Sequence, residues 1–106
     1  MKQAKQLRHP NRKDITLARV LHALSDPVRL SVVADLAAGT ERSSSEFECG
    51  VANSTLSHHI KVLRLAGVIN HRKAGTRCFV MLRPELERAF PGLLASIVKF
   101  EKRKAP

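Results

Sequence analysis

The sequence has no tryptophan and no tyrosine, and only four phenylalanines and two cysteines among its 106 residues. Any hydrophobic core must therefore be largely aliphatic. Two cysteines are too few for the disulfide framework of a small secreted domain. No apolar run approaches the roughly 20 residues of a membrane-spanning helix, and the polar start MKQAKQLRHPNRKD lacks the apolar stretch of a secretory signal. We therefore expect a cytoplasmic protein with no membrane segment.

Acidic residues are also scarce, since nine Asp and Glu oppose nineteen Lys and Arg and leave a formal net charge of +10. All nine lie at or before Glu48 or at or after Glu85, so the stretch between Cys49 and Pro84 has none. The same stretch contains six lysines and arginines and three histidines. A surface that only needs to be soluble mixes both signs, whereas a cationic stretch of this length is typical of a surface that binds nucleic-acid phosphates.

The segment NSTLSHHIKVLRLAGVI at positions 53–69 predicts a short amphipathic helix. Apolar residues recur on one face at i, i+4 and i+7, which is the spacing of an α-helix packed on a core. These residues are Leu56, Ile60 and Leu63. Asn53 can cap the helix by accepting a hydrogen bond from its first free N–H groups. Gly67 suits the position after the last turn, where a left-handed conformation favours glycine.

The opposite face of this helix carries small polar groups at its N-terminal end and cations further along. Such groups can enter the major groove of DNA without a clash, as the second helix of a helix-turn-helix does. The preceding residues 40–52 predict a short helix and a tight turn, which is the order that this motif requires. His59 lies nearer the apolar face, where either packing or a flanking phosphate contact suits it. The residues expected to contact DNA are Asn53, Ser54, Thr55, Ser57, His58, Lys61 and Arg64.

Two β-prone runs follow at 68–71 and 78–82, and a basic tip with a glycine joins them at 72–77. This pattern predicts a β-hairpin with a cationic end. Beside a reading helix, we expect the hairpin to act as a wing that lies along the DNA backbone or probes the minor groove. Its expected DNA contacts are Arg72, Lys73, Thr76 and Arg77. The predicted fold is a single, mainly α winged helix-turn-helix domain with a β-hairpin wing.

The rest of the chain predicts helices at both ends of this domain. Asp14 can cap the first helix, and Asp26 followed by Pro27 can begin the second. Positions 93–100 predict a strongly apolar last helix, which needs a partner surface in so small a chain. We therefore expect a homodimer that forms through the terminal helices. The residues expected at the dimer interface are Leu17, Leu21, Leu94, Ile97 and Val98.

The two ends of the chain are basic and polar, and we expect flexible tails at residues 1–13 and 102–106. The DNA-binding and dimerisation domain would then cover residues 14–101. The N-terminal tail could add non-specific affinity for DNA.

Histidine and cysteine are the side chains in this region that could carry chemistry. His58 and His59 are adjacent on a helix and point in different directions, and no acid lies nearby in sequence to orient them. We therefore expect no enzyme activity. Cys49 and Cys78 could form a redox switch. Cys78 lies in an apolar strand and suits a structural role, so Cys49, which flanks the reading helix, is the better sensor candidate.

Three segments in this order resemble the ArsR-type regulators, the arsenic-repressor family of bacterial winged helix-turn-helix proteins. LHALSDPVRLSVVADL resembles the family's second-helix signature, and NSTLSHHIKVLRLAGVI resembles its recognition helix with the Leu-x-x-Ala-Gly exit. The hairpin tip from Arg72 to Arg77 occupies the place of the family's wing. The resemblance implies a homodimer that binds a palindromic operator on double-stranded DNA and usually represses transcription until an effector releases it.

The chain departs from the metal-sensing members of that family. Those members carry a Cys-x-Cys pair before the turn, or Asp and His ligands on the last helix. Here the stretch from Ser43 to Cys49 has one cysteine, and the stretch from Glu85 to Lys104 has no histidine. We therefore expect neither metal site and no cofactor, and the small-molecule effector stays unidentified.

Two other functions fit parts of the pattern. A non-specific nucleoid or RNA-binding module would explain the basic ends of the chain, but not the small polar groups that begin the reading helix. A protein–protein adaptor on the same fold is less well supported, because the surface expected for positions 49–84 is basic rather than apolar.

Overall fold

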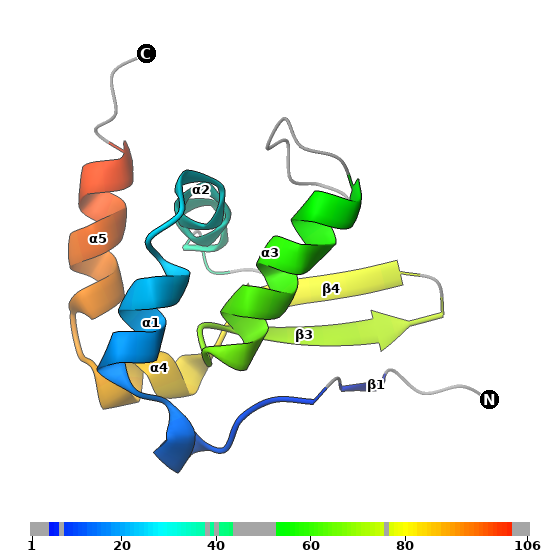
Figure 1. Cartoon of the computed structure of the whole chain (residues 1–106), viewed down its shortest axis with the longest axis horizontal. Coiled ribbons are helices and arrows are strands. Elements are labelled where there is room, and N and C mark those ends of the chain that lie inside the picture. The colour runs from blue at the N-terminus through cyan, green and yellow to red at the C-terminus, as the bar shows by residue number, and fades with distance from the viewer. Residues whose placement is uncertain are drawn as a thin grey trace.

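The computed structural model describes residues 5–6, 8–37, 39, 41–43, 53–75 and 77–102. Helices gather at one end of a small antiparallel sheet, and its two longer strands extend away from them as a hairpin (Figure 1). The described elements are β1 (Lys5–Gln6), η1 (Arg12–Asp14), α1 (Leu17–Ala23), α2 (Pro27–Leu36), β2 (Arg42–Ser43), α3 (Asn53–Leu65), β3 (Ile69–Ala74), β4 (Arg77–Leu82), α4 (Pro84–Ala89) and α5 (Leu93–Lys102). This is the mainly helical, winged architecture predicted from the sequence. The short helix and turn expected before α3 lie mostly outside the described residues.

The predicted hairpin is confirmed. Strands β3 and β4 pair from Ile69 opposite Leu82 to Ala74 opposite Arg77. Two short strands that the sequence did not predict extend this pair and give the order β1-β3-β4-β2. Each has only two residues, and so short a stretch carries no alternation from which a strand could be predicted.

Helix α2 begins as the sequence predicts, whereas α1 does not. The Asp26 carboxylate accepts hydrogen bonds from the backbone N–H of Val28 at 2.8 Å and of Arg29 at 3.1 Å, and it caps α2. Helix α1 is capped by Thr16, whose hydroxyl accepts from the Arg19 N–H at 3.3 Å. Asp14 instead belongs to the short helix η1, because buried Ile15 follows it in an extended conformation before α1 starts.

The hydrophobic core lies between the helices and the sheet and is aliphatic, as expected. Leu56, Ile60 and Leu63 of α3 are 8%, 1% and 0% exposed, which confirms the predicted apolar face. They join buried residues of α1, α2 and β4 in one cluster. At the end of α3, Gly67 has a φ of +85°, which confirms its predicted place after the last turn.

The described part of residues 1–13, for which we predicted a flexible tail, contacts the domain at three places. Strand β1 pairs with β3, with Lys5 opposite Lys73. The His9 ring accepts a hydrogen bond from the His71 N–H at 2.9 Å, and the Pro10 carbonyl accepts from the Arg83 guanidinium at 2.8 Å. The backbone carbonyls and the His9 ring of this segment supply acceptors to donors of the domain, and composition alone does not distinguish this role from that of a solvated tail.

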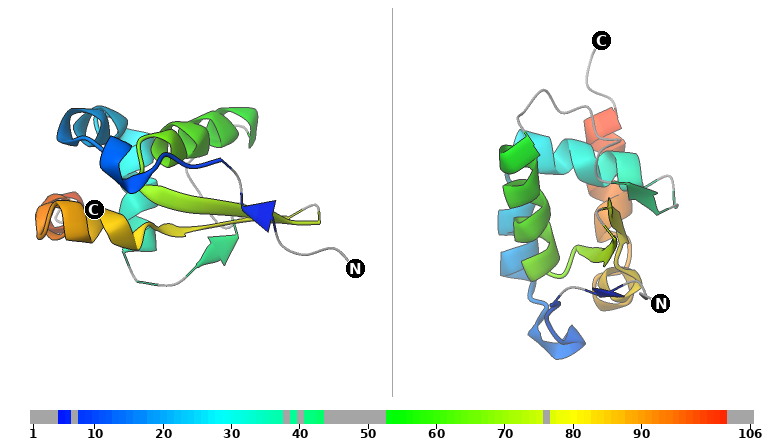
Figure 2. Two further views of the ribbon diagram at one scale, coloured as in Figure 1. Left: turned by 90° about the horizontal axis from the view of Figure 1, so that it is seen from below. Right: turned by 90° about the vertical axis from the view of Figure 1, so that its right-hand side faces the viewer.

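The terminal helices lie together at the end of the molecule opposite the hairpin tip (Figures 1 and 2). Helix α5 crosses and contacts α2 of the same chain, and Leu94 and Val98 are buried to 8% exposure each. These two residues, which we predicted at the dimer interface, belong to the chain's own core cluster, and their place in an interface stays a prediction. Leu17 and Leu21 of α1 remain 45% and 46% exposed.

In the described part of the chain, no helix is long and apolar enough to cross a membrane.

Candidate nucleic-acid interface

The outer face of α3 carries the polar residues that the sequence assigned to DNA contact. The exposed residues on this face are Ser54, Thr55, Ser57, His58 and Lys61. Asn53 begins the helix, but its side chain lies outside the description. The N-terminal end of α3 and the β3–β4 tip point to the same side of the molecule, away from α1 and α5 (Figures 1 and 2). A helix and a hairpin in this arrangement can contact one duplex from the same side.

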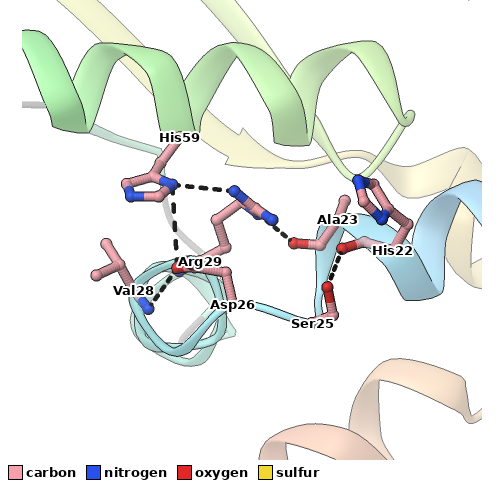
Figure 3. Close-up of polar contacts among 7 residues, drawn as sticks. All are labelled: His22, Ala23, Ser25, Asp26, Val28, Arg29 and His59. Carbon is pink, nitrogen blue, oxygen red and sulfur yellow. Dashed lines mark hydrogen bonds and ion pairs between the residues drawn. The ribbon is translucent and has the colours of Figure 1, made fainter.

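His59 packs against α2 and does not belong to this outer face. Its side chain is 12% exposed, and its Nδ1 lies 3.1 Å from the Arg29 guanidinium and 3.9 Å from the Asp26 carboxylate (Figure 3). Arg29 also donates to the Ala23 carbonyl at 2.6 Å. These contacts join the start of α2, the end of α1 and the middle of α3. Of the two roles left open for His59, the structure shows packing.

The Asp26 carboxylate is ionised in this cluster. Burial alone would raise its pKa, but hydrogen bonds from the backbone of Arg29 and Val28, together with the nearby charges of His59 and Arg29, lower it below its usual value. The negative charge of this cap at the start of α2 also interacts favourably with the positive end of the helix dipole. The cluster therefore links the start of α2 to the middle of α3.

Two of the predicted DNA contacts already have partners within the chain. The Arg72 guanidinium donates to both carboxylate oxygens of Glu41, at 2.7 and 2.8 Å, and stacks 4.6 Å above the Phe79 ring. The hydrogen bond from Arg72 is the main reason that the pKa of Glu41 is lowered. Arg64 donates to the Arg8 carbonyl at 2.6 Å. The stretch of 49–84 is free of acids in sequence, but the fold brings Glu41 against it.

We predict that replacing Glu41 by glutamine strengthens DNA binding about threefold and steepens its salt dependence by about one counterion, because it releases Arg72 for a phosphate. Fluorescence anisotropy over a salt series measures both quantities. Glu87→Gln removes the same charge on α4 and keeps an oxygen acceptor for the Gly92 N–H, so it should change affinity less. Equal effects from the two variants would show that Arg72 makes no DNA contact.

The hairpin tip holds the remaining predicted contacts. Lys73 and Arg77 are exposed, and Gly75 forms the turn between them with a φ of +65°. Thr76, the fourth predicted wing contact, lies outside the described residues. Cys78 is a free, half-buried thiol on β4, whereas Cys49 also lies outside the described residues, so the redox hypothesis stays a prediction.

His71 is a half-buried titratable group that the sequence did not single out. Its pKa is lowered to about 4, first because burial penalises the charged ring and then because the charges of Arg64, His9 and Lys73 oppose a further proton. Both ring nitrogens are buried, without a hydrogen-bond partner among the described residues. The ring is therefore neutral at physiological pH. A histidine in the middle of a short, basic strand has no sequence signal for burial of this kind.

Acidification should destabilise the protein through His71. The unfolded ring takes a proton near pH 6.5 and the folded ring only near pH 4, so the unfolded state gains protons first and stability falls across this window. Because His71 is partly exposed, we discount the full effect of its pKa and expect the free energy of unfolding to fall by about 1 kcal/mol between pH 7 and pH 5. Urea unfolding at both pH values measures it. His71→Gln should lose less than the native protein over the same interval, and an equal loss would assign the effect to other groups.

Comparison with known proteins gives a consistent result. A helix-turn-helix domain model matches residues 24–72. An uncharacterized HTH-type transcriptional regulator of Bacillus subtilis (strain 168), YceK, is 34% identical over 84 residues, which cover 76% of this chain and 84% of that protein.

Solved structures agree with this match. The crystal structure of the transcriptional repressor BigR from Xylella fastidiosa is 31% identical, with a TM-score of 0.59 over 81% of this chain and 79% of that one. A possible transcriptional regulatory protein from Mycobacterium bovis is 26% identical, with a TM-score of 0.61 over 81% of this chain and 86% of that one. The exposed polar face of α3, the hairpin beside it and these similarities lead to one conclusion: the chain belongs to the helix-turn-helix family of transcriptional regulators.

Proposed function

We propose that this regulator is an ArsR-type repressor that binds a palindromic operator in double-stranded DNA. The observation that carries the proposal is the outer face of α3, where exposed Ser54, Ser57 and His58 precede the exposed cation Lys61. Small polar groups can approach base edges in the major groove, and hydroxyls also bind phosphate. The likeness to the repressor BigR supports the direction of regulation.

The hairpin supplies the second half of the proposed contact. Lys73 and Arg77 would bind the phosphate backbone or the minor groove beside the site that α3 reads. Arg72 and Arg64 would join them only after exchanging their partners within the chain, which are Glu41 and the Arg8 carbonyl. We therefore expect α3 and the cations of the hairpin tip to contribute most to the affinity for DNA, and these two arginines to contribute less.

A competition binding assay tests the proposal. Operator candidates are selected from a random duplex library, and the best sequence is then competed against random DNA at fixed, near-physiological salt. A repressor should prefer its operator by about 10³ or more. The rival function, a non-specific nucleoid or RNA-binding module, predicts nearly equal affinity for all duplexes or a preference for RNA. Either of those results would replace our proposal.

The proposed repressor is a homodimer that uses the exposed part of its terminal helices. Leu17 and Leu21 lie one turn apart on α1, and Phe100 of α5 is 65% exposed. Large apolar side chains left exposed together in a small protein are typical of an interface. A two-fold axis through this end of the molecule would present both α3 helices to one duplex. Ile97 is half-buried against the core and would lie at the edge of the interface.

Replacing both Leu17 and Leu21 by glutamate should convert the dimer to monomer, because it would bury four carboxylates in the symmetric interface. Sedimentation velocity at micromolar concentration measures the change. We expect the dissociation constant of the dimer to increase by at least about a hundredfold. Leu65→Glu is the matched control, since Leu65 is 45% exposed on α3. A native protein that sediments as a monomer at all concentrations would contradict the proposed dimer.

A further inference from the structure

An apolar groove lies between α1 and the C-terminal half of α3. It encloses about 420 Å³, which is within the usual range for a small-molecule site. Its walls are Ala18, Ala23, Val62, Leu65 and Ala66, with Arg19 and His22 beside them. Figure 3 shows the His22 ring near the last turn of α3. The groove is separate from the outer face of α3 that we assign to DNA.

A second, cationic hollow adjoins this groove and shares Arg19 and Leu65 with it. It encloses about 690 Å³ and is lined by the segment that leads into α1, including Arg8, Lys13 and Asp14. Three cations therefore face one carboxylate in this hollow. In the part of the chain that the structure describes, the Arg19 guanidinium has no hydrogen-bond or ion-pair partner. An open apolar groove thus adjoins a hollow in which the cations outnumber the carboxylate.

We infer that these joined hollows form a binding site for a small amphipathic carboxylate, with its apolar chain between α1 and α3 and its carboxylate on Arg19. An uncharged apolar molecule would leave the cationic end unused, and a small hydrophilic anion would leave the apolar walls exposed to water. A guanidinium binds a carboxylate through two parallel hydrogen bonds, which gives the site both affinity and orientation. Lys13 and Arg8 add charge around the same end.

The position of the groove couples it to α3. Val62 and Leu65 belong to α3 and Ala66 to the turn that follows, whereas Ala18 and Arg19 belong to α1. A ligand between the two helices therefore contacts α3 on the face toward α1, opposite the outer face assigned to DNA. It alters the position or mobility of α3 relative to α1. This regulatory step rests on the proposed function, but binding of the ligand does not.

The first experiment titrates octanoate into the full chain and follows backbone amide shifts by NMR. Shifts should concentrate on positions 18–23 and 62–66. Octan-1-ol, which has the same chain and no charge, should bind at least about tenfold more weakly, because it lacks the charge-assisted hydrogen bonds. Acetate, which has the charge and no chain, should cause no comparable shifts at the same concentration.

Variants separate the two ends of the site. Ala18→Phe fills the apolar groove and should weaken octanoate binding at least tenfold, whereas Ala37→Phe adds the same ring at an exposed position beyond α2 and should not. Arg19→Gln should remove most of the preference for octanoate over octanol, with Arg88→Gln on α4 as its control. Thermal unfolding of each variant confirms that the fold is intact.

Three results would overturn the inference. One is the absence of localised shifts up to millimolar octanoate, and another is equal affinity for the acid and the alcohol. The third is a groove that a second copy of the chain covers in the dimer. Dissociation of the dimer by Leu65→Glu, together with new solvent exposure of the backbone amides at positions 62–66, would show this. For regulation, octanoate should change operator affinity by about fivefold or more, and no change would reject that step alone. Absence of operator binding without ligand would instead reject the proposed function and leave the NMR result standing.

Discussion

The double variant in which glutamate replaces both Ser57 and Lys61 should bind the operator about a thousandfold more weakly, without unfolding of the protein. Each loss of a base or phosphate contact costs about 1–3 kcal/mol, and each new carboxylate also repels the duplex. Roughly 4 kcal/mol in total corresponds to a factor of 10³. Both side chains are exposed on the outer face of α3, so the core is untouched. Fluorescence anisotropy at a fixed salt concentration measures the loss.

Single variants show where this effect comes from. Lys61→Glu alone should reduce affinity by about tenfold to a hundredfold. Arg88→Glu makes the same change of charge at an exposed position on α4, and it should reduce affinity by about threefold or less, through the net charge alone. If Lys61→Glu and Arg88→Glu weaken binding equally, α3 is not the reading helix, whatever the wing contributes.

The apolar period of α3 could be predicted because it depends only on spacing within one helix. Leu56, Ile60 and Leu63 are buried, and Ser57 and Lys61 are exposed, as that period requires. His59 lies between the two faces, so its role depended on what packs beside it. Arg29 and Asp26 decide it, and these residues are some thirty positions away along the chain.

The structure adds to the predicted surface a feature that the sequence did not show, which is pairing between segments far apart in sequence. Glu41 lies outside the stretch that is free of acids and still neutralises Arg72 within it. The backbone of the N-terminal segment occupies Arg64 and Arg83. A count of charges along the chain gives the sign of the surface, but it does not show which cations are available to a phosphate.

The residues predicted at the dimer interface fall into two groups in the structure. An amphipathic last helix must bury one face, but the sequence does not say against which chain. In the structure, Leu94 and Val98 are buried against their own core, whereas Leu17 and Leu21 are left exposed. An exposed apolar residue is therefore a better indicator of the partner surface than an apolar helix as a whole.

Replacing Gly67 by alanine should destabilise the protein by about 3 kcal/mol. Gly67 ends α3 with hydrogen bonds from its own N–H to the Arg64 carbonyl and from the Val68 N–H to the Leu63 carbonyl, both at 3.0 Å, as a left-handed helix end requires. Its φ of +85° costs an alanine about 1 kcal/mol. A Cβ there would also lie 2.6 Å from Cγ1 of buried Ile15, and relieving that overlap costs about 1–3 kcal/mol more.

Gly92→Ala separates the two causes, because Gly92 has a φ of +84° and no atom within 4 Å of an added Cβ. It should cost only the conformational part, about 1 kcal/mol. Ile15→Ala removes the clashing side chain, so in the double variant Gly67→Ala should cost about as little as Gly92→Ala does. Urea unfolding of the four proteins and the native chain measures this cycle. If Ile15→Ala gives no relief, then contact with Ile15 does not explain the requirement for glycine at the end of the reading helix, and backbone conformation alone must account for it.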